Sequence, residues 1–290
     1  MIARDLLEQL VKCCLLPVGA LRRDKRPGVM VLGYHRVAGG SARPIDLPAD
    51  LFAWQVAYLH AHYRLVSLDE VVRVAREGRA YPDDLVALTF DDGYEEVYLH
   101  AFPILLRYRV PATVYLATAA VEEGRPFPFE AALPPQLQGR PLSWAQAREM
   151  KRSGLITFGA HTHTHVDLTS LPLRLAEEEI RRANALIAER LGAPPAHFSY
   201  PWGLFSGETR ALVDRNYSTA VIGGTRKNRF GAIDLGALQR VPIQRSDGRA
   251  LFRLKLSGYL FAEEWLRGGA GPVRSAGPEA VPPSEASAVR

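Results

Sequence analysis

The sequence contains only two cysteines and no long hydrophobic run, and each shortage excludes a class of protein. Cys13 and Cys14 are adjacent, which is a poor geometry for a mutual bridge, so no disulfide framework is expected. The longest stretch without Asp, Glu, Lys or Arg, residues 191–207, has three prolines and three glycines among its 17 residues. Such a stretch cannot form a spanning helix, and we expect no transmembrane span.

The N-terminus also lacks the features of a signal peptide. Glu8 and Lys12 interrupt its apolar run, and no small-x-small cleavage site follows. We therefore expect a cytoplasmic chain that begins at Met1. With 290 residues, of which 47% are hydrophobic and 23% charged, the chain has the composition of a globular protein. That composition excludes wholesale disorder.

The excess of positive charge is small, since 36 Lys and Arg against 31 Asp and Glu leave a net charge of +5. Residues 22–26 are the one basic cluster, and they follow an apolar stripe made of Leu6, Leu7, Leu10, Cys14 and Val18. A solvated charge cluster is the simpler interpretation. The alternative is peripheral contact with an anionic membrane at its inner face. Nucleic-acid binding is not expected, because aromatic residues are not interleaved with the basic ones.

We expect the chain to divide into an N-terminal amphipathic and basic segment (1–27), one globular domain (28–262) and a disordered tail (263–290). Of the 23 residues from Gly268 to Arg290, 16 are Gly, Pro, Ser or Ala, which is typical of disorder. Short apolar strands alternate with helical patterns through the domain. About seven such units predict the α/β class and a distorted (β/α) barrel, with a doubly wound open sheet as the competing architecture.

The hydrophobic pattern places strands and helices as follows. Strands are expected at 29–33, 64–67, 85–90, 112–117, 155–160, 197–200, 218–222 and 238–243. Helices are expected at 51–63, 68–77, 94–108, 144–153, 173–191, 207–216 and 248–261. Residues 118–142, with five prolines, are expected to be irregular, and an irregular segment of this length is usually functional or mobile.

Two carboxylates follow the clearest buried strand, in the sequence Thr89-Phe90-Asp91-Asp92-Gly93. Adjacent carboxylates at a strand end repel one another unless they have partners, and a cation would relieve the repulsion. Gly93 allows a sharp turn, so that the two carboxylates can point at different targets. An Asp-Asp-Gly turn is also an ordinary turn, and the residues alone leave both interpretations open.

Three histidines lie within five residues, at His161, His163 and His165, after another predicted strand. At four-residue spacing His161 and His165 can face the same way, and His is the commonest metal ligand near neutral pH. Two histidines and one carboxylate form a common ligand set for catalytic Zn²⁺ or non-haem Fe²⁺. His163, between them, is a bystander in this interpretation.

A third segment, residues 198–203, reads Phe-Ser-Tyr-Pro-Trp-Gly and also follows a predicted strand. Pro201 and Gly203 could simply terminate the strand. Alternatively, Trp202 provides an aromatic wall for a sugar, and backbone N–H groups of the segment face a developing oxyanion.

Together the three segments resemble the motifs of the polysaccharide deacetylase family, carbohydrate esterase family 4. Thr89–Gly93 matches the first motif, His161–His165 matches the His-Ser/Thr-x-x-His motif, and Ser199–Gly203 partly matches the third, which ends Pro-x-Gly. The order and spacing of the motifs agree, and the resemblance spans roughly residues 28–245.

The resemblance implies a barrel enzyme that removes N-acetyl groups from amino sugars with one divalent metal ion. Carried over residue by residue, Asp92, His161 and His165 would bind the metal and Asp91 would be the general base. The backbone N–H of Tyr200 would stabilise the oxyanion, and Pro201, Trp202 and Gly203 would line the substrate site. Zn²⁺ is the favoured ion, with Co²⁺ or Ni²⁺ as alternatives.

The chain departs from the family pattern at two points. The third motif usually carries an arginine that orients the base aspartate, and here Arg240 is the candidate substitute. The family commonly has a general-acid histidine near the end of the domain, but this chain has none after His197. The segment Tyr34-His35-Arg36-Val37 resembles one in the subgroup that deacetylates poly-N-acetylglucosamine, in which an N-terminal histidine, here His35, is the general acid. A satisfied strand-end histidine is the simpler alternative.

The function predicted from the sequence is metal-dependent removal of N-acetyl groups from an amino sugar in a polysaccharide, oligosaccharide or lipid-linked glycan precursor. An N-acetylated glycan is the expected partner. Two alternatives stay open: a sugar-binding pseudoenzyme of a polysaccharide assembly complex, and a deformylase or amidase that acts on a different amide.

Overall fold

Seven parallel strands close into a barrel in the computed structural model, which describes residues 26–257. In their order around the barrel, the strands are β1 (Gly28–Tyr34), β11 (Leu238–Pro242), β9 (Thr219–Gly223), β8 (His197–Ser199), β7 (Ile156–Ala160), β6 (Ala112–Leu116) and β5 (Leu85–Phe90). Pairing of β1 with β5 closes the ring, over a register that runs from Val29 with Leu85 to Tyr34 with Phe90. This closure confirms the predicted distorted barrel and excludes the open sheet.

Short strands extend the barrel on two sides. β4 (Arg64–Leu65) pairs with β5, and β10 (Asn228–Arg229) pairs antiparallel with β1. β2 (Arg36–Val37) and β3 (Asp46–Leu47) form a separate parallel pair in the loop after β1.

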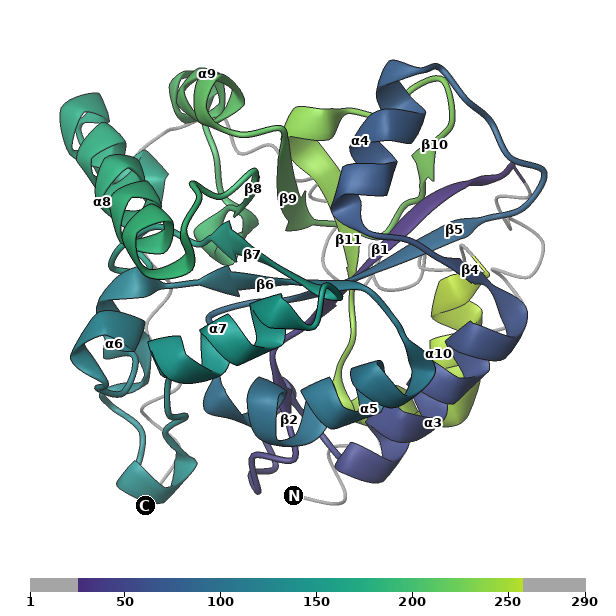
Figure 1. The fold of residues 1–290 in the computed structure, drawn as a ribbon, viewed down its shortest axis with the longest axis horizontal. Helices are drawn as coiled ribbons and strands as arrows, with labels where there is room; N and C mark the ends of the chain where they lie inside the picture. The colour runs from purple at the N-terminus through teal and green to yellow at the C-terminus, as the bar shows by residue number, and fades with distance from the viewer. Residues whose placement is uncertain (1–25, 258–290) are drawn as a thin grey trace, which may run out of the picture.

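Helices surround the barrel (Figure 1). They are α3 (Ala49–His62), α4 (Leu68–Arg76), α5 (Phe102–Tyr108), α6 (Thr118–Glu123), α7 (Trp144–Arg152), α8 (Leu173–Leu191), α9 (Gly207–Asn216) and α10 (Gly248–Leu256). Several begin at side-chain caps. Ser143 and Gln146 form a capping box at α7, and Ser67 accepts a hydrogen bond from the Glu70 N–H at α4.

The prediction that residues 118–142 are irregular is wrong at its N-terminal end. Residues 118–123 contain neither proline nor glycine and form α6, which ends at Gly124 with φ of 64°. The rest of the segment holds only two short 3₁₀ turns, Pro128–Glu130 and Pro135–Leu137. The helix expected over 94–108 is helical from residue 95, and it contains a π-helical turn at Val97–Ala101 immediately before α5.

Two predicted segments lie outside the described residues. These are the amphipathic segment, except for Arg26 and Pro27, and the tail at 263–290. The boundaries 1–27, 28–262 and 263–290 therefore stay predictions. Among residues 26–257, no helix is long and apolar enough to cross a membrane.

Successive residues of each barrel strand belong to different parts of the core. On β1, Val29 and Val31 pack in one apolar cluster with residues of α4, whereas Met30 and Leu32 belong to the larger cluster under the other helices. This alternation is the period of a β-strand with both faces buried. The side of the wall that carries Val29 and Val31 becomes polar toward the carboxyl ends of the strands, where Thr89 and Arg240 are buried.

Two glycines line this polar part of the barrel, and only one of them is required there by the space available. A Cβ atom at Gly33 would lie 3.7 Å from the Arg240 side chain, which is ordinary contact. A Cβ atom at Gly159 would lie 2.5 Å from the Tyr115 ring and 2.7 Å from the His197 carbonyl oxygen. Real Cβ atoms do not approach so closely, and the buried Tyr115 ring has little freedom to move.

We predict that Gly159→Ala lowers the free energy of unfolding by about 1–3 kcal/mol, because the added methyl group overpacks the barrel. Gly207→Ala is the matched control, since no atom lies within 4 Å of the Cβ position at the start of α9. Urea unfolding of both variants measures the difference. Equal stability of Gly159→Ala and the wild type would contradict the packing argument.

Candidate active site

The predicted site residues gather at the carboxyl ends of the barrel strands. His35 follows β1, Asp91 and Asp92 follow β5, His161 follows β7, and Tyr200 follows β8. Because parallel strands of a barrel all end at one rim, residues up to 165 positions apart reach the same place.

Asp92, His161 and His165, here called the metal trio, form one buried cluster. Asp92 Oδ1 lies 3.4 Å from His161 Nε2 and 3.2 Å from His165 Nε2, and all three ligand atoms lie within 4.8 Å of one another. Ligands held about 2.0–2.1 Å from a tetrahedral Zn²⁺ ion lie about 3.3 Å apart. The spacing of the trio therefore fits a divalent cation.

The hydrogen bonds of His161 point to the same conclusion. Its Nδ1 lies 2.7 Å from the carbonyl oxygen of Ser199, and because a carbonyl can only accept, Nδ1 carries the proton. In the neutral ring, Nε2 then presents a lone pair to Asp92 Oδ1, which is buried without a hydrogen-bond partner among the described residues. Two acceptors facing one another repel unless a proton or a metal cation lies between them, and the Ser199 carbonyl orients the imidazole as ligand partners in metal sites do.

Asp91 turns away from the trio and pairs with Arg240 from β11. The Arg240 Nη1 and Nη2 atoms donate to Asp91 Oδ1 and Oδ2 at 2.6 and 2.7 Å, which is a bidentate pair. Both side chains are buried. Arg240 thus lies against Asp91, where a substitute for the missing third-motif arginine was expected.

The two carboxylates stay ionised despite their burial. Burial opposes the charge on Asp91, but the Arg240 guanidinium and the nearby imidazoles outweigh it and lower the pKa of Asp91 to about 2. Burial likewise opposes the charge on Asp92, and the imidazoles of the trio hold its pKa well below the usual value. Asp91 is therefore available as a base at neutral pH.

His35 lies beside this base. Its Nε2 atom is 3.9 Å from Asp91 Oδ2, and its side chain is 32% exposed. The remaining exposed surface leaves room for a substrate to reach the imidazole. His163 instead turns away from the trio, with Nδ1 2.9 Å from Thr118 Oγ1.

The third motif differs from the expectation at Tyr200. The N–H of Tyr200 donates to the Val221 carbonyl at 3.2 Å in the ladder between β8 and β9, so it is not free to bind an oxyanion. The Tyr200 ring is buried against Phe198 and Phe205. The prediction that the Tyr200 N–H serves this role is therefore not supported, because parallel pairing extends one residue past the strand.

The neighbouring Trp202 lies at the site. It has a positive φ of 60°, its side chain is 62% exposed, and its ring centroid is 5.0 Å from that of His165. Within residues 26–257 its N–H makes no hydrogen bond. Pro201 is buried. Gly203 has a φ of 72°, and a Cβ atom added to it would lie 3.0 Å from the backbone nitrogen of Gly223.

One aromatic residue at the site was not predicted. Phe129 places its ring centroid 4.2 Å from that of His165 and 5.9 Å from that of Trp202. We call Phe129 and Trp202 the aromatic rim. The only signal in the sequence was the pair Phe127 and Phe129 in a proline-rich segment, and nothing in that pattern distinguishes the residue that contacts the site.

Backbone strain is concentrated here. Of the six non-glycine residues with positive φ among the described residues, Asp92, Thr162, His165 and Trp202 lie in the site. Glu179 from α8 binds the loop that carries two of them. Its Oε2 accepts hydrogen bonds from the N–H groups of residues 163 and 164 at 3.0 and 2.8 Å, and its Oε1 accepts one from the Thr164 hydroxyl at 3.1 Å. This carboxylate holds the loop in its strained form.

We predict that Glu179→Ala weakens Zn²⁺ binding about 10- to 100-fold, because the spacing of His161 and His165 depends on the loop that Glu179 holds. Competition with a chromophoric chelator measures the affinity. Glu178→Ala is the control, since that carboxylate bonds only to Arg181 on the exposed surface of α8. Unchanged affinity in a folded Glu179→Ala protein would contradict the prediction.

Comparison with known proteins agrees with the geometry. A family model described as polysaccharide deacetylase matches residues 78–220. The YxkH protein of Bacillus subtilis (strain 168) is 23% identical over 196 residues, which are 67% of this chain and 64% of that protein. The poly-beta-1,6-N-acetyl-D-glucosamine N-deacetylase of Staphylococcus aureus (strain MRSA252) is 22% identical over 214 residues, which are 66% of this chain and 70% of that protein.

Among solved structures, IcaB from Ammonifex degensii superposes with a TM-score of 0.67 at 29% identity, over 80% of this chain and 97% of that one. The likeness includes the barrel, and the matched region contains all three members of the metal trio together with Asp91. The motifs, the geometry of the site and these matches agree that residues 78–220 form a polysaccharide deacetylase domain.

Proposed function

We propose that this protein is a metal-dependent de-N-acetylase that acts on an N-acetylated amino sugar within a glycan. The observation that carries the proposal is the separation of two adjacent carboxylates. Asp92 faces two imidazoles, whereas Asp91 is held by Arg240 and lies beside His35. One carboxylate is thus placed to bind a cation and the other to act as a base.

The metal trio would hold the ion, and the donor set of two imidazoles and one carboxylate is typical of catalytic Zn²⁺. When bound, such an ion supplies Lewis acidity, which polarises an acyl oxygen and lowers the pKa of water toward about 7. Zn²⁺ is our first choice, with Co²⁺ or Ni²⁺ as alternatives.

The protein's own groups would move the protons. Asp91, ionised and oriented by Arg240, would take the proton of the water that attacks the amide carbon. His35 would give a proton to the amine as it leaves, since it is partly exposed and adjoins the base. The N–H of Trp202 replaces that of Tyr200 as our candidate donor to the oxyanion.

The substrate class rests on the relatives and on the aromatic rim. The Staphylococcus aureus relative is named for deacetylation of poly-beta-1,6-N-acetyl-D-glucosamine, and a β-linked N-acetylglucosamine oligomer is the first substrate to test here. The exposed Trp202 ring offers an apolar face on which a sugar ring can pack.

Of the two alternative functions, the pseudoenzyme has lost support, and the deformylase or amidase can be distinguished by its product. A sugar-binding pseudoenzyme was suggested by the missing arginine, and Arg240 supplies a guanidinium at the base. Action on a formyl group would release formate rather than acetate, so product analysis distinguishes the two reactions.

We further propose that the protein acts in the cytoplasm, on a precursor at the inner membrane face. The support is the apolar stripe and basic cluster of residues 6–26. Recovery of the native chain only in the soluble fraction after gentle, low-salt lysis would contradict this location.

We predict that Asp91→Asn lowers kcat about 10²- to 10⁴-fold while metal content is unchanged, because the amide cannot accept the proton. Acetate release from an N-acetylglucosamine oligomer measures the rate at matched metal loading. Asp234→Asn, at a partly exposed ion pair with Arg210, is the control. Turnover near the wild-type value in Asp91→Asn would refute the proposed base.

His161→Ala should abolish the binding of about one metal ion per chain, since two of three protein ligands cannot hold the ion tightly. Metal analysis of protein purified without added metal, before and after incubation with Zn²⁺, provides the test. A full equivalent retained in the variant would show that the ion binds elsewhere.

Arg240→Lys should lower kcat by up to about 10²-fold without loss of metal, because an ammonium group cannot make two parallel bonds that fix the carboxylate plane. Arg210→Lys, which alters a partly exposed guanidinium, is the matched control. If Arg240→Lys has wild-type kcat, charge alone suffices and the bidentate geometry has no catalytic role.

A further inference from the structure

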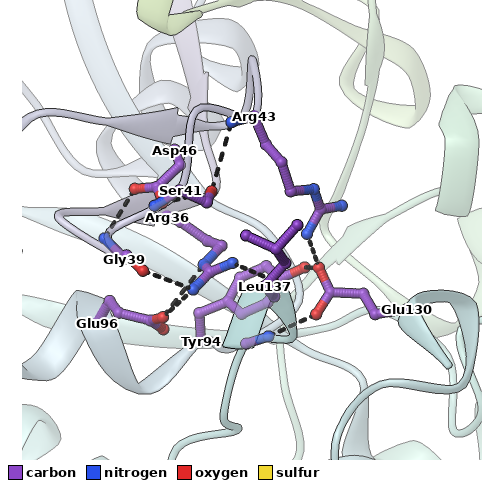
Figure 2. A network of polar contacts seen from close by, with 10 residues as sticks. Arg36, Gly39, Ser41, Arg43, Asp46, Tyr94, Glu96, Glu130 and Leu137 are labelled. Carbon is purple, nitrogen blue, oxygen red and sulfur yellow. Dashed lines mark hydrogen bonds and ion pairs between the residues drawn. The ribbon is translucent and has the colours of Figure 1, made fainter. Parts of the chain in front are cut away.

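A network of charges lies outside the three motifs, where the chain after β1 meets the segment between α6 and α7. This buried ion network consists of Arg36, Arg43, Tyr94, Glu96 and Glu130 (Figure 2). The Glu130 carboxylate has no exposed surface. It pairs with Arg43 and accepts hydrogen bonds from the Tyr94 hydroxyl at 2.9 Å and the Gly139 N–H at 2.6 Å.

Arg36 attaches the same segment at a second point. Its guanidinium donates to Glu96 Oε1 from Nε at 3.1 Å and from Nη2 at 2.5 Å. Nη1 donates to the Leu137 carbonyl at 2.9 Å, and the guanidinium lies 5.4 Å from the centre of the Tyr94 ring. Figure 2 shows Arg36 and Glu130 on two sides of this ring. Residues 127–141 are thus held along their length by buried charges.

The members of the network adjoin residues of the candidate active site in sequence. Arg36 follows His35, Tyr94 comes two residues after Asp92, and Glu130 follows Phe129. The last link is the most direct, because the Phe129 ring contacts those of His165 and Trp202. A change in the position of residue 130 therefore moves one half of the aromatic rim.

Stability alone is a weak reason to keep such a network. Removal of a carboxylate and a guanidinium from water costs several kcal/mol for each ion, and apolar residues of similar volume often give equal or greater stability. Residues 127–141 contain four prolines and have one isolated bridge, between Pro141 and Tyr94, in place of a sheet partner. Directional bonds to buried charges can fix one conformation where backbone pairing does not.

We propose that Glu130 is a positioning residue, which sets Phe129 against His165 and Trp202 and so determines how tightly the glycan binds at the rim. The inference rests on the proposed function, because it assigns the rim to the substrate. Glu130 itself is fully buried and does not contact substrate. Its substitution should therefore affect substrate binding more than the chemical step.

The test compares Glu130→Gln with wild type on an N-acetylglucosamine oligomer. We expect KM to rise about tenfold with kcat within about threefold, because the rim contacts ground state and transition state alike. Hydrogen exchange measured by mass spectrometry should become about tenfold faster in residues 127–141 than in the wild type. Arg43→Lys, which keeps the charge at a partly exposed position, should change both quantities in the same direction by a smaller factor.

Glu178→Gln is the matched control, since it alters a glutamate paired with an arginine on the exposed face of α8. A merely structural role for Glu130 would lower kcat in proportion to the folded fraction and leave KM unchanged, and that result overturns the proposal. Unchanged hydrogen exchange in residues 127–141 also overturns the proposal. If Glu130→Gln folds poorly, the same measurement on Arg43→Lys decides the question. Absence of acetate release from the wild type would refute the proposed function instead, and the exchange data would still decide whether the network holds the segment.

Discussion

The pairing of β1 with β5 is the constraint on which the site depends. It closes the barrel, and its register sets Tyr34 opposite Phe90. The residues that follow this pair, His35 and Asp91, therefore leave the barrel side by side. A slip of one residue would exchange the faces of the whole strand and separate His35 from Asp91. The chemistry of the rim is thus fixed first by backbone hydrogen bonds.

Electrostatics then decides what each carboxylate can do. Asp91 and Asp92 are adjacent and buried, and like charges so close would favour a protonated form of one of them. The left-handed backbone at Asp92 directs the two side chains apart, to Arg240 and to the imidazoles. Arg240 reaches Asp91 from within the barrel wall, because β11 pairs with the same strand, β1, as β5 does. Packing and charge are therefore arranged by the same few residues.

The sequence predicted the parts of this site that depend on local pattern. Buried strands followed at once by polar residues marked the segments that meet at the rim, and the resemblance to the deacetylase motifs then implied Asp92, His161 and His165 as metal ligands and Asp91 as the base. Arg240 was a weaker prediction, since it lies within a strand and only the register places it under Asp91. Phe129 and Glu179 were missed because their roles come from tertiary contacts between segments without a motif. The Tyr200 N–H, predicted to face the oxyanion, instead donates to the Val221 carbonyl, and this one further ladder bond cannot be read from sequence.

The left-handed residues of the site bear on how this enzyme can be engineered. Thr162 is β-branched, and for such a residue a φ of 60° is costly, on the order of 1–3 kcal/mol. A search for thermostable variants would therefore tend to select glycine or asparagine at such positions. Each replacement would relax the loop that spaces His161 and His165. In this protein the simplest gains in heat resistance and the retention of activity are in conflict at the same few residues.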